Sequence, residues 1–134
     1  MTGIYFLLGK TDASTLHQLL DADEMWHFND GDPIYIVEVE WEEDDKPRVS
    51  LTKLGNPFKH PGAVLQHVVP SGKWFGAVPC EGTDYALVGC AVSPGFTFSR
   101  FKLCDTDVAT RLKCKLGDAV PPQLLAILPR AQNA

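Results

Sequence analysis

The 134-residue sequence has no hydrophobic run long enough to cross a membrane, no basic stripe and no signal-peptide pattern. A membrane-spanning helix needs about 20 apolar residues, whereas the opening run 4–8 is short and lacks a preceding basic region. The net charge of −5 argues against a nucleic-acid partner. We therefore expect no membrane and no nucleic-acid partner, and a cytoplasmic location.

Paired-cysteine motifs are also lacking. The four cysteines, Cys80, Cys90, Cys104 and Cys114, form no C-x-x-C pair, which argues against a zinc site. A chain of this length does not need disulfides to build a core, so we expect free thiols. The sequence also has no G-x-S-x-G elbow, phosphate-binding loop or H-E-x-x-H motif.

What the sequence does contain is a series of short strand patterns separated by turn residues. These patterns lie at 4–8, 24–28, 35–41, 49–51, 63–69, 74–78 and 85–92. In the segment 35–41 the apolar residues share one face and Glu38 and Glu40 share the other, which predicts a half-buried end. Many short strands without β-α-β alternation predict an all-β sandwich or barrel.

The C-terminal part changes to helical patterns. Asp105 or Thr106 is a suitable helix N-cap, and Gly117 a suitable end. Pro121 and Pro122 then predict the start of a second short helix. We expect a barrel over 1–104 and a helical tail over 105–134 that covers one end of the barrel or a partner subunit.

Residues 17–31 resemble the first signature of the cupin superfamily, H-x-H-x(3,4)-E-x(6)-G. His17, Glu24 and Gly31 match its first histidine, its glutamate and its glycine, while Leu19 stands at the second histidine. The resemblance implies a cupin jelly-roll β-barrel, with His17 and Glu24 facing its interior.

Residues 70–75 resemble the first half of the second cupin signature, P-x-G-x(2)-H, but Phe75 stands at its histidine. Cupins commonly bind a divalent metal through these histidines and the glutamate, and only two of the four ligands are present. Leucine and phenylalanine cannot donate to a metal. We therefore expect no cofactor and no firmly bound metal, and a weakly bound divalent metal is the alternative.

The blocks 4–8, 23–28, 31–33, 69–75 and 85–96 are similar to one branch of the cupins, labelled domain of unknown function 985. Its members are often described as predicted sugar epimerases. Members usually carry an upstream segment with a His-Pro-Glu-Gly-Gly-like motif, and this sequence starts directly at the first shared strand. If that segment contributes to the pocket, a catalytic group is missing here.

The resemblance implies a catalytic pair, His17 and Glu24. Histidine titrates near neutral pH and suits removal of a proton next to a carbonyl, and Tyr5, Tyr35 or Tyr85 would return the proton from the other face. A carboxylate inside a barrel needs a partner, and we expect His17 to be the partner of Glu24. A purely structural ion pair is the alternative.

Further contacts to a ligand are predicted from residues expected to line the pocket: Trp26, Tyr35, Gln66, Trp74 and Phe75. Aromatic faces suit sugar rings or nucleobases, although both tryptophans also suit a core and Gln66 an exposed strand position. The apolar opening strand and the need to protect sheet edges favour a homodimer.

Three hypotheses for function follow. The first is a metal-independent epimerase or isomerase of a sugar or sugar-nucleotide, with His17 as the base. The second is a non-catalytic binding module for a small polar or aromatic metabolite. The third, a metal-dependent cupin dioxygenase, requires a ligand set that the sequence does not supply.

Overall fold

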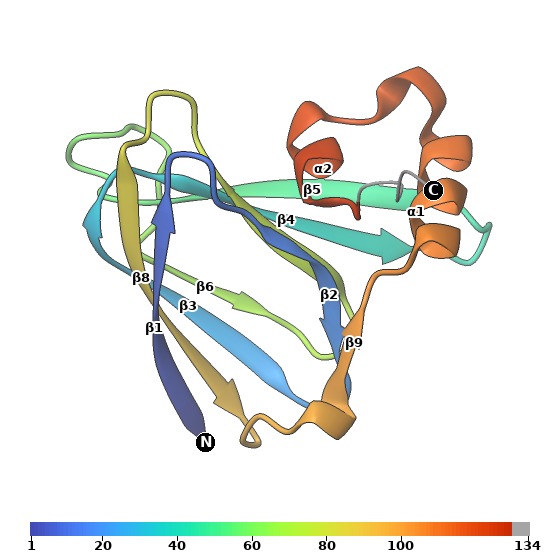
Figure 1. Cartoon of the computed structure of the whole chain (residues 1–134), viewed down its shortest axis with the longest axis horizontal. Helices are drawn as coiled ribbons and strands as arrows, with labels where there is room; N and C mark the ends of the chain where they lie inside the picture. Colours follow the sequence, from blue (N-terminus) through green and yellow to red (C-terminus); the bar gives the residue numbers. More distant parts are fainter. Residues whose placement is uncertain (130–134) are drawn as a thin grey trace.

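Two antiparallel β-sheets face each other in the computed structural model, which describes residues 1–129 (Figure 1). The four-stranded sheet has the order β1-β8-β3-β6 and the five-stranded sheet the order β5-β4-β7-β2-β9. The strands are β1 (Thr2–Gly9), β2 (Ser14–Leu19), β3 (Asp23–Gly31), β4 (Ile34–Trp41), β5 (Pro47–Leu54), β6 (Gln66–Val69), β7 (Trp74–Pro79), β8 (Tyr85–Ser93) and β9 (Phe101–Leu103). The predicted all-β class with a short helical tail is confirmed.

A first hydrophobic core fills the space between the sheets. Because side chains alternate across a strand, every second residue of each sheet points into this space. Leu8, Trp26 and Val88 enter from the four-stranded sheet, and Ile36 and Phe75 from the five-stranded sheet. This core closes the barrel and positions the inward-facing residues described below.

A second core lies on the outer face of the five-stranded sheet. Leu16 and Val37 pack there against Leu112, Leu124 and Ile127 of the C-terminal helices, and Figure 1 shows these helices beside β4 and β5. β4 is therefore buried on both faces. The prediction of a half-buried end in this segment is wrong for Glu38, which is only 4% exposed.

The helices begin and end where the capping residues predict. α1 (Thr106–Leu116) has Asp105 as its N-cap, whose carboxylate accepts a 2.9 Å hydrogen bond from the Val108 N–H. Gly117 ends α1 with a φ of 55°, in the left-handed region that glycine tolerates. α2 (Pro122–Ile127) begins with proline. Residues 130–134 of the predicted tail lie outside the described residues. Within 1–129, no helix is long and apolar enough to span a membrane.

Three parts of the strand prediction need correction. β2, which carries His17, was not predicted because its sequence STLHQL has too few apolar residues for a clear alternation. The predicted strand 63–69 shortens to β6, with Val64 making an isolated bridge to Leu54. The expected extended segment around Phe98 is a short 3-10 helix (Phe98–Arg100) followed by β9.

The glycine of the first motif has a clear structural reason. Gly31 adopts a φ of 94° where β3 ends, and a Cβ there would lie 2.3 Å from the carbonyl oxygen of Tyr85. Only glycine fits this combination of positive φ and close backbone approach. The turn returns the chain into β4, so that the two sheets face each other.

Candidate functional site

A cavity of about 460 Å³ opens between the two sheets. Residues of β1, β3 and β8 form one wall, and residues of β2 and β9 form the opposite wall. The lining contains two titratable side chains, three hydroxyl groups, one thiol and a largely apolar remainder: His17, Glu24, Thr2, Ser14, Thr15, Cys90, Ile4, Phe6, Leu19, Trp26, Val92, Phe96, Phe101 and Leu103. Its size and its mixture of apolar walls with a few polar groups are typical of small-molecule sites.

His17 enters the cavity from β2 and is held as a neutral imidazole. Its Nδ1 lies 2.7 Å from the carbonyl oxygen of Thr15, and because a carbonyl only accepts, Nδ1 carries the proton. Burial lowers the pKa of His17, although the hydrogen bond to Thr15 opposes this shift. The ring packs 4.2 Å from Phe75 and 5.4 Å from Phe101, between ring centroids. The neutral form therefore keeps Nε2 unprotonated and able to accept a proton.

Glu24 enters the same cavity from β3, and burial shifts its carboxyl group toward the protonated form. Glu24 is only 8% exposed. Burial raises the pKa of its carboxyl group from 4.5 to about 7, and a hydrogen bond from the Cys90 thiol acts to lower this pKa. Burial and the charge of Glu24 in turn raise the pKa of the Cys90 thiol. Cys90 is therefore a neutral hydrogen-bond donor, and Glu24 is a carboxyl group that exchanges its proton near neutral pH.

The structure brings His17 and Glu24 to one cavity but does not pair them. Within residues 1–129 no hydrogen bond or ion pair joins the two side chains, and Glu24 instead has Cys90 as its partner. The expectation that His17 is the direct partner of Glu24 is therefore wrong. The two groups belong to different sheets and stand on opposite walls, which leaves space for a ligand between them.

Of the five predicted binding residues, Trp26 lines the cavity and Phe75 lies directly beneath its surface. Trp26 lines it and is only 1% exposed, and its Nε1 donor has no hydrogen-bond partner among the described residues. Phe75 lies beneath the cavity surface, in contact with His17 on one side and edge-on to Trp26, with centroids 6.5 Å apart, on the other. Phe75 therefore supports the imidazole and does not line the cavity.

The other three predicted binding residues are elsewhere, and this part of the prediction is corrected. Tyr35 and Trp74 point to the outer face of the five-stranded sheet, where they pack with the core formed by the C-terminal helices. Gln66 lies on β6 with its side chain exposed, and its amide contacts His27 Nδ1 at 3.3 Å. Strand alternation explains all three positions, because their neighbours Ile36, Phe75 and His67 are the ones that point inward.

None of the described tyrosines lines the cavity. Tyr5 is 81% exposed on the outer face of β1, and the hydroxyl of Tyr85 donates a 2.8 Å hydrogen bond to Asp30. Tyr35 is partly buried on the outer face of the five-stranded sheet, so the expectation of a tyrosine acid has no support from the geometry. Glu24 is the group that occupies the wall opposite His17.

Comparison with known proteins now decides the family. The model of the family described as the cupin superfamily (DUF985) matches residues 1–104. The chain belongs to this cupin family.

Some solved structures similar to this cupin have a stated enzymatic activity and others do not. A Shewanella oneidensis protein is 31% identical with a TM-score of 0.79, covering 96% of this chain and 75% of that chain. A dTDP sugar isomerase from Desulfovibrio desulfuricans is 14% identical with a TM-score of 0.66, covering 81% and 66%. A dTDP-4-dehydrorhamnose 3,5-epimerase from Elizabethkingia anophelis is 16% identical with a TM-score of 0.60, covering 96% and 67%. The two enzymes share the fold at low identity. Among curated proteins, none matches this sequence.

The metal centre common in cupins does not fit the residues of this cupin. Of the four motif positions, Leu19 lines the cavity and Phe75 lies buried beside it, and both are hydrocarbon. The Nδ1 of His17 is engaged with Thr15, which leaves one nitrogen and the Glu24 carboxylate as donors. Among residues 1–129 no group of three or more His, Cys, Asp and Glu side chains is arranged to hold a metal ion. We therefore derive no chemistry through a metal in this site.

Several cavity residues of this cupin were missed by sequence reasoning. The hydroxyls of Ser14 and Thr15 were missed because β2 was not predicted. Cys90 had a usable signal, because the alternation of 85–92 places it on the same face as Val88 and Val92. Thr2 and Phe6 lie on the inward face of β1, but its continuous apolar run gave no indication of which face points inward.

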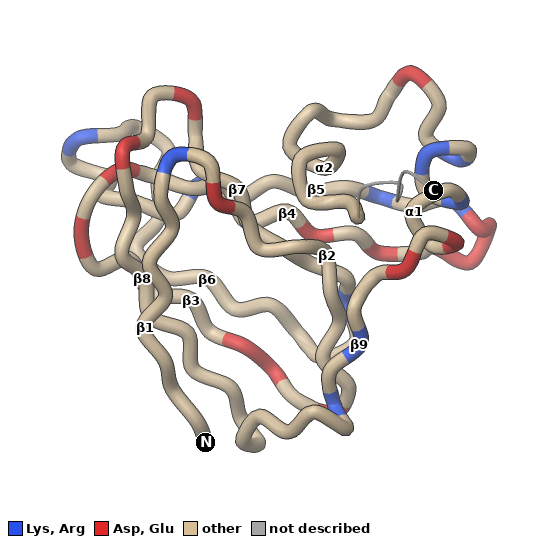
Figure 2. The backbone as a smooth tube through the Cα atoms, viewed as in Figure 1, with Lys and Arg blue, Asp and Glu red and all other residues tan. Residues whose placement is uncertain are grey.

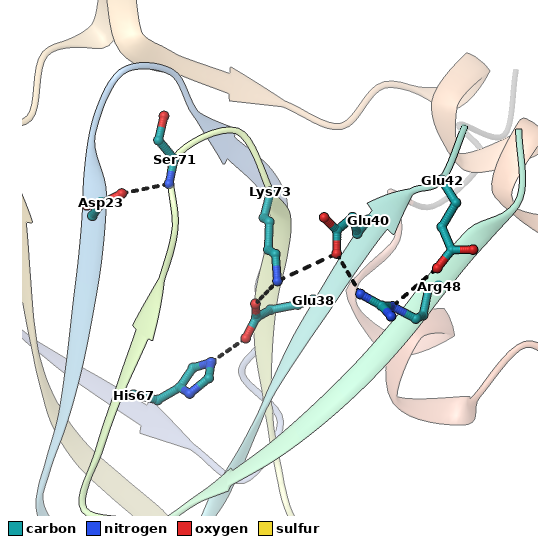
Figure 3. Close-up of polar contacts among 8 residues, drawn as sticks. All are labelled: Asp23, Glu38, Glu40, Glu42, Arg48, His67, Ser71 and Lys73. Atoms are coloured by element: carbon teal, nitrogen blue, oxygen red, sulfur yellow. Dashed lines mark hydrogen bonds and ion pairs between the residues drawn. The ribbon is translucent and has the colours of Figure 1, made fainter. Parts of the chain in front are cut away.

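A second polar cluster of this cupin joins Glu38, His67 and Lys73 (Figure 3). In the strand register His67 is paired with Trp26 and Glu38 with Phe75. The buried carboxylate of Glu38 binds His67 of β6 and lies 3.4 Å from the Lys73 ammonium group. Burial of Glu38 acts to raise its pKa, but the contacts with His67 and Lys73 outweigh this and leave the pKa below its usual value. No role was predicted for His67. The contact between His67 and Glu38 connects β6 of one sheet with β4 of the other.

Proposed function

We propose that this cupin binds a sugar-type hydroxycarbonyl compound in the cavity and epimerises or isomerises it by proton transfer, without a metal. The observation that carries the proposal is the placement of two titratable groups on opposite walls of one cavity: neutral His17 and Glu24, whose pKa is about 7. A base and an acid at the same pH are what such a reaction requires.

The chemistry uses one proton at each wall. The Nε2 of His17 removes the proton from a carbon next to the carbonyl, and the electron pair of the broken C–H bond forms an enolate. Protonated Glu24 then donates its proton to the opposite face of that carbon, and the carbonyl re-forms. The product has the inverted configuration, with the imidazole charged and the carboxylate ionised, and proton exchange with water resets both groups.

The lining supports a ligand of this class. The hydroxyls of Thr2, Ser14 and Thr15 suit the hydroxyl groups of a sugar, and the rings of Trp26 and Phe101 suit its apolar face. The sugar isomerase and epimerase named above have the same fold, which makes sugar compounds a reasonable first panel. Function does not follow from fold alone, so the proposal rests on the cavity.

The test is hydrogen exchange in deuterated water. Wild-type protein and a panel of nucleotide-linked and free keto-sugars are incubated, and deuterium incorporation is followed by mass spectrometry and NMR. We expect incorporation next to the carbonyl with the wild type, and a loss of roughly 100-fold or more with His17→Gln or Glu24→Gln, the usual contribution of a general acid or base. His60→Gln, in the loop between β5 and β6, is the matched control and keeps full activity.

A non-catalytic binding module is the second candidate, favoured by the largely apolar lining and by the hydrogen bond that already engages Glu24. Native mass spectrometry of the purified protein distinguishes the two. A ligand that is retained and released unchanged, with no deuterium incorporated across the panel, supports the module and contradicts the epimerase.

A further inference from the structure

The cavity between the sheets changes in character from its deep part to its mouth. Glu24, Trp26 and Cys90 are buried and form the deep part. Ile4 and Leu103 line the same cavity but are 60% and 54% exposed, so they lie where the cavity meets solvent. A ligand whose reacting carbon reaches Glu24 therefore extends its other end past hydrocarbon side chains at the mouth.

Aromatic rings extend this apolar mouth. Phe96 lines the cavity, and Phe98, which is 84% exposed, packs edge-on against it with ring centroids 5.3 Å apart. The backbone N–H of Phe96 donates a 2.9 Å hydrogen bond to the Thr2 hydroxyl oxygen, and this bond ties two lining residues of the mouth together. Exposed aromatic rings at the entrance of a cavity favour an apolar group on the ligand.

The described residues that line the cavity include no lysine or arginine. Of the lining strands, β1, β2 and β8 contain no Lys, Arg, Asp or Glu, and they are drawn without charged residues in Figure 2. Lys102 of β9 points away from the cavity, because its ammonium group lies 5.6 Å from the centroid of the Trp74 ring on the outer face of the sheet. Arg100, which precedes β9, donates a 2.9 Å hydrogen bond to the carbonyl oxygen of Asp21. Both cations near the mouth are therefore engaged elsewhere.

This distribution of charge disfavours an anionic ligand. Proteins bind phosphate groups through Arg or Lys side chains or through the N–H groups at a helix N-terminus. The first helix after the cavity strands, α1, has the Asp105 carboxylate already bound to an N–H of its first turn and Asp107 beside it. Within the cavity His17 is neutral, and Glu24 repels an anion when it is ionised. A phosphate attached to a sugar at Glu24 would lie at the apolar mouth without a counter-charge, which is costly.

We propose that the cavity takes an uncharged hydroxycarbonyl compound with an alkyl or aryl substituent, and that it excludes phosphorylated and nucleotide-linked forms. The hydroxycarbonyl end lies between His17 and Glu24, a placement that rests on the proposed function. The substituent lies against Ile4, Phe96 and Leu103 at the mouth. The two enzymes of the same fold named above act, by their names, on dTDP-linked compounds, so this ligand class separates this cupin from them.

Binding to the purified protein tests the charge and the apolar group separately. The probes are hydroxyacetone, α-hydroxyacetophenone, which has a phenyl ring in place of the methyl group, the same compound with a phosphate on its ring, and dTDP. Isothermal titration calorimetry and ligand-observed NMR measure the dissociation constants. We expect α-hydroxyacetophenone to bind at least roughly 10-fold more tightly than hydroxyacetone, because its ring buries apolar area at the mouth. We expect the phosphorylated probe and dTDP to bind at least roughly 10-fold more weakly than α-hydroxyacetophenone.

Leu103→Lys supplies a positive charge at the mouth. Leu103 is more than half exposed on the edge strand β9, so a lysine fits there with its ammonium group in water. We expect this variant to gain at least roughly 10-fold in affinity for the phosphorylated probe. Phe58→Lys, which adds the same charge at a 93% exposed position in a loop, is the matched control and gains nothing. Circular dichroism and cooperative unfolding establish that each variant is folded.

Wild-type protein that binds the phosphorylated probe or dTDP as tightly as α-hydroxyacetophenone overturns the proposal. The same holds if hydroxyacetone and α-hydroxyacetophenone bind equally, or if neither binds. An equal gain in Phe58→Lys and Leu103→Lys contradicts the assignment to the mouth of the cavity. Binding of the uncharged probe without deuterium exchange contradicts the proton transfer and leaves the ligand class intact, whereas exchange with dTDP-linked sugars contradicts the ligand class and leaves the proton transfer intact.

Discussion

Glu24→Gln should change how stability depends on pH. The folded protein holds the pKa of Glu24 at about 7, against 4.5 in the unfolded chain, because burial disfavours the charged form. Between these values the folded state binds more protons than the unfolded state, so stability falls as pH rises from about 4.5 to 7 and then stays level. A shift of about 2.5 units corresponds to a loss on the order of 3 kcal/mol.

The measurement is the free energy of unfolding by urea at several pH values from 5 to 8. Burial of His17 acts in the opposite direction, since its lowered pKa makes stability fall as pH drops below 6.5. The difference in the free energy of unfolding between wild type and Glu24→Gln isolates the contribution of the glutamate. We expect the variant to become more stable relative to the wild type as pH rises. Glu43→Gln, at an exposed position after β4, is the control. If the free energy of unfolding depends on pH equally in wild type and Glu24→Gln, the raised pKa of Glu24 is refuted.

Three further predictions follow from the packing. Trp74→Ala should cost about 3–5 kcal/mol of stability in urea unfolding, because it leaves a cavity under the C-terminal helices, and should leave ligand binding unchanged. Gly76→Val should cost more than 1 kcal/mol, because a Cβ there lies 2.5 Å from the Ser14 carbonyl oxygen and 2.8 Å from Ile127 Cδ1; unchanged protection of α2 in hydrogen exchange would contradict this contact. Glu38 has a lowered pKa, so it stabilises the fold above pH 4.5 and loses this effect as pH falls; Glu38→Gln should abolish that acid-dependent loss, and an unchanged acid transition would refute it.

The fold was largely predictable because its local signals agree. Turn residues separate the strand patterns, and the caps at Asp105 and Gly117 set the ends of α1. β2 was not predictable in the same way. Its burial comes from pairing with β7 and β9 on its two sides, which is a long-range property that a six-residue pattern does not contain.

The candidate site was predictable only in part. His17 and Glu24 follow from their motif spacing, but their true partners, the Thr15 carbonyl and the Cys90 thiol, depend on how the strands are arranged. Tyr35 and Trp74 were predicted to be pocket residues because they are aromatic and lie on strands of the barrel. Their orientation was ambiguous because the five-stranded sheet has two buried faces, and the sequence does not distinguish the face toward the cavity from the face under the helices.

The family match ends at a residue where the chain cannot be truncated without exposing a core. The match stops at residue 104, yet the second core takes Leu16, Val37 and Val39 from before that point and Leu112, Leu124 and Ile127 from after it. A fragment ending at 104 would expose a broad apolar sheet surface to water, and we expect it to aggregate. The part of the chain that the family model matches and the part that packs around the second core therefore have different boundaries. Swapping barrels between family members requires the matching C-terminal segment to move with them.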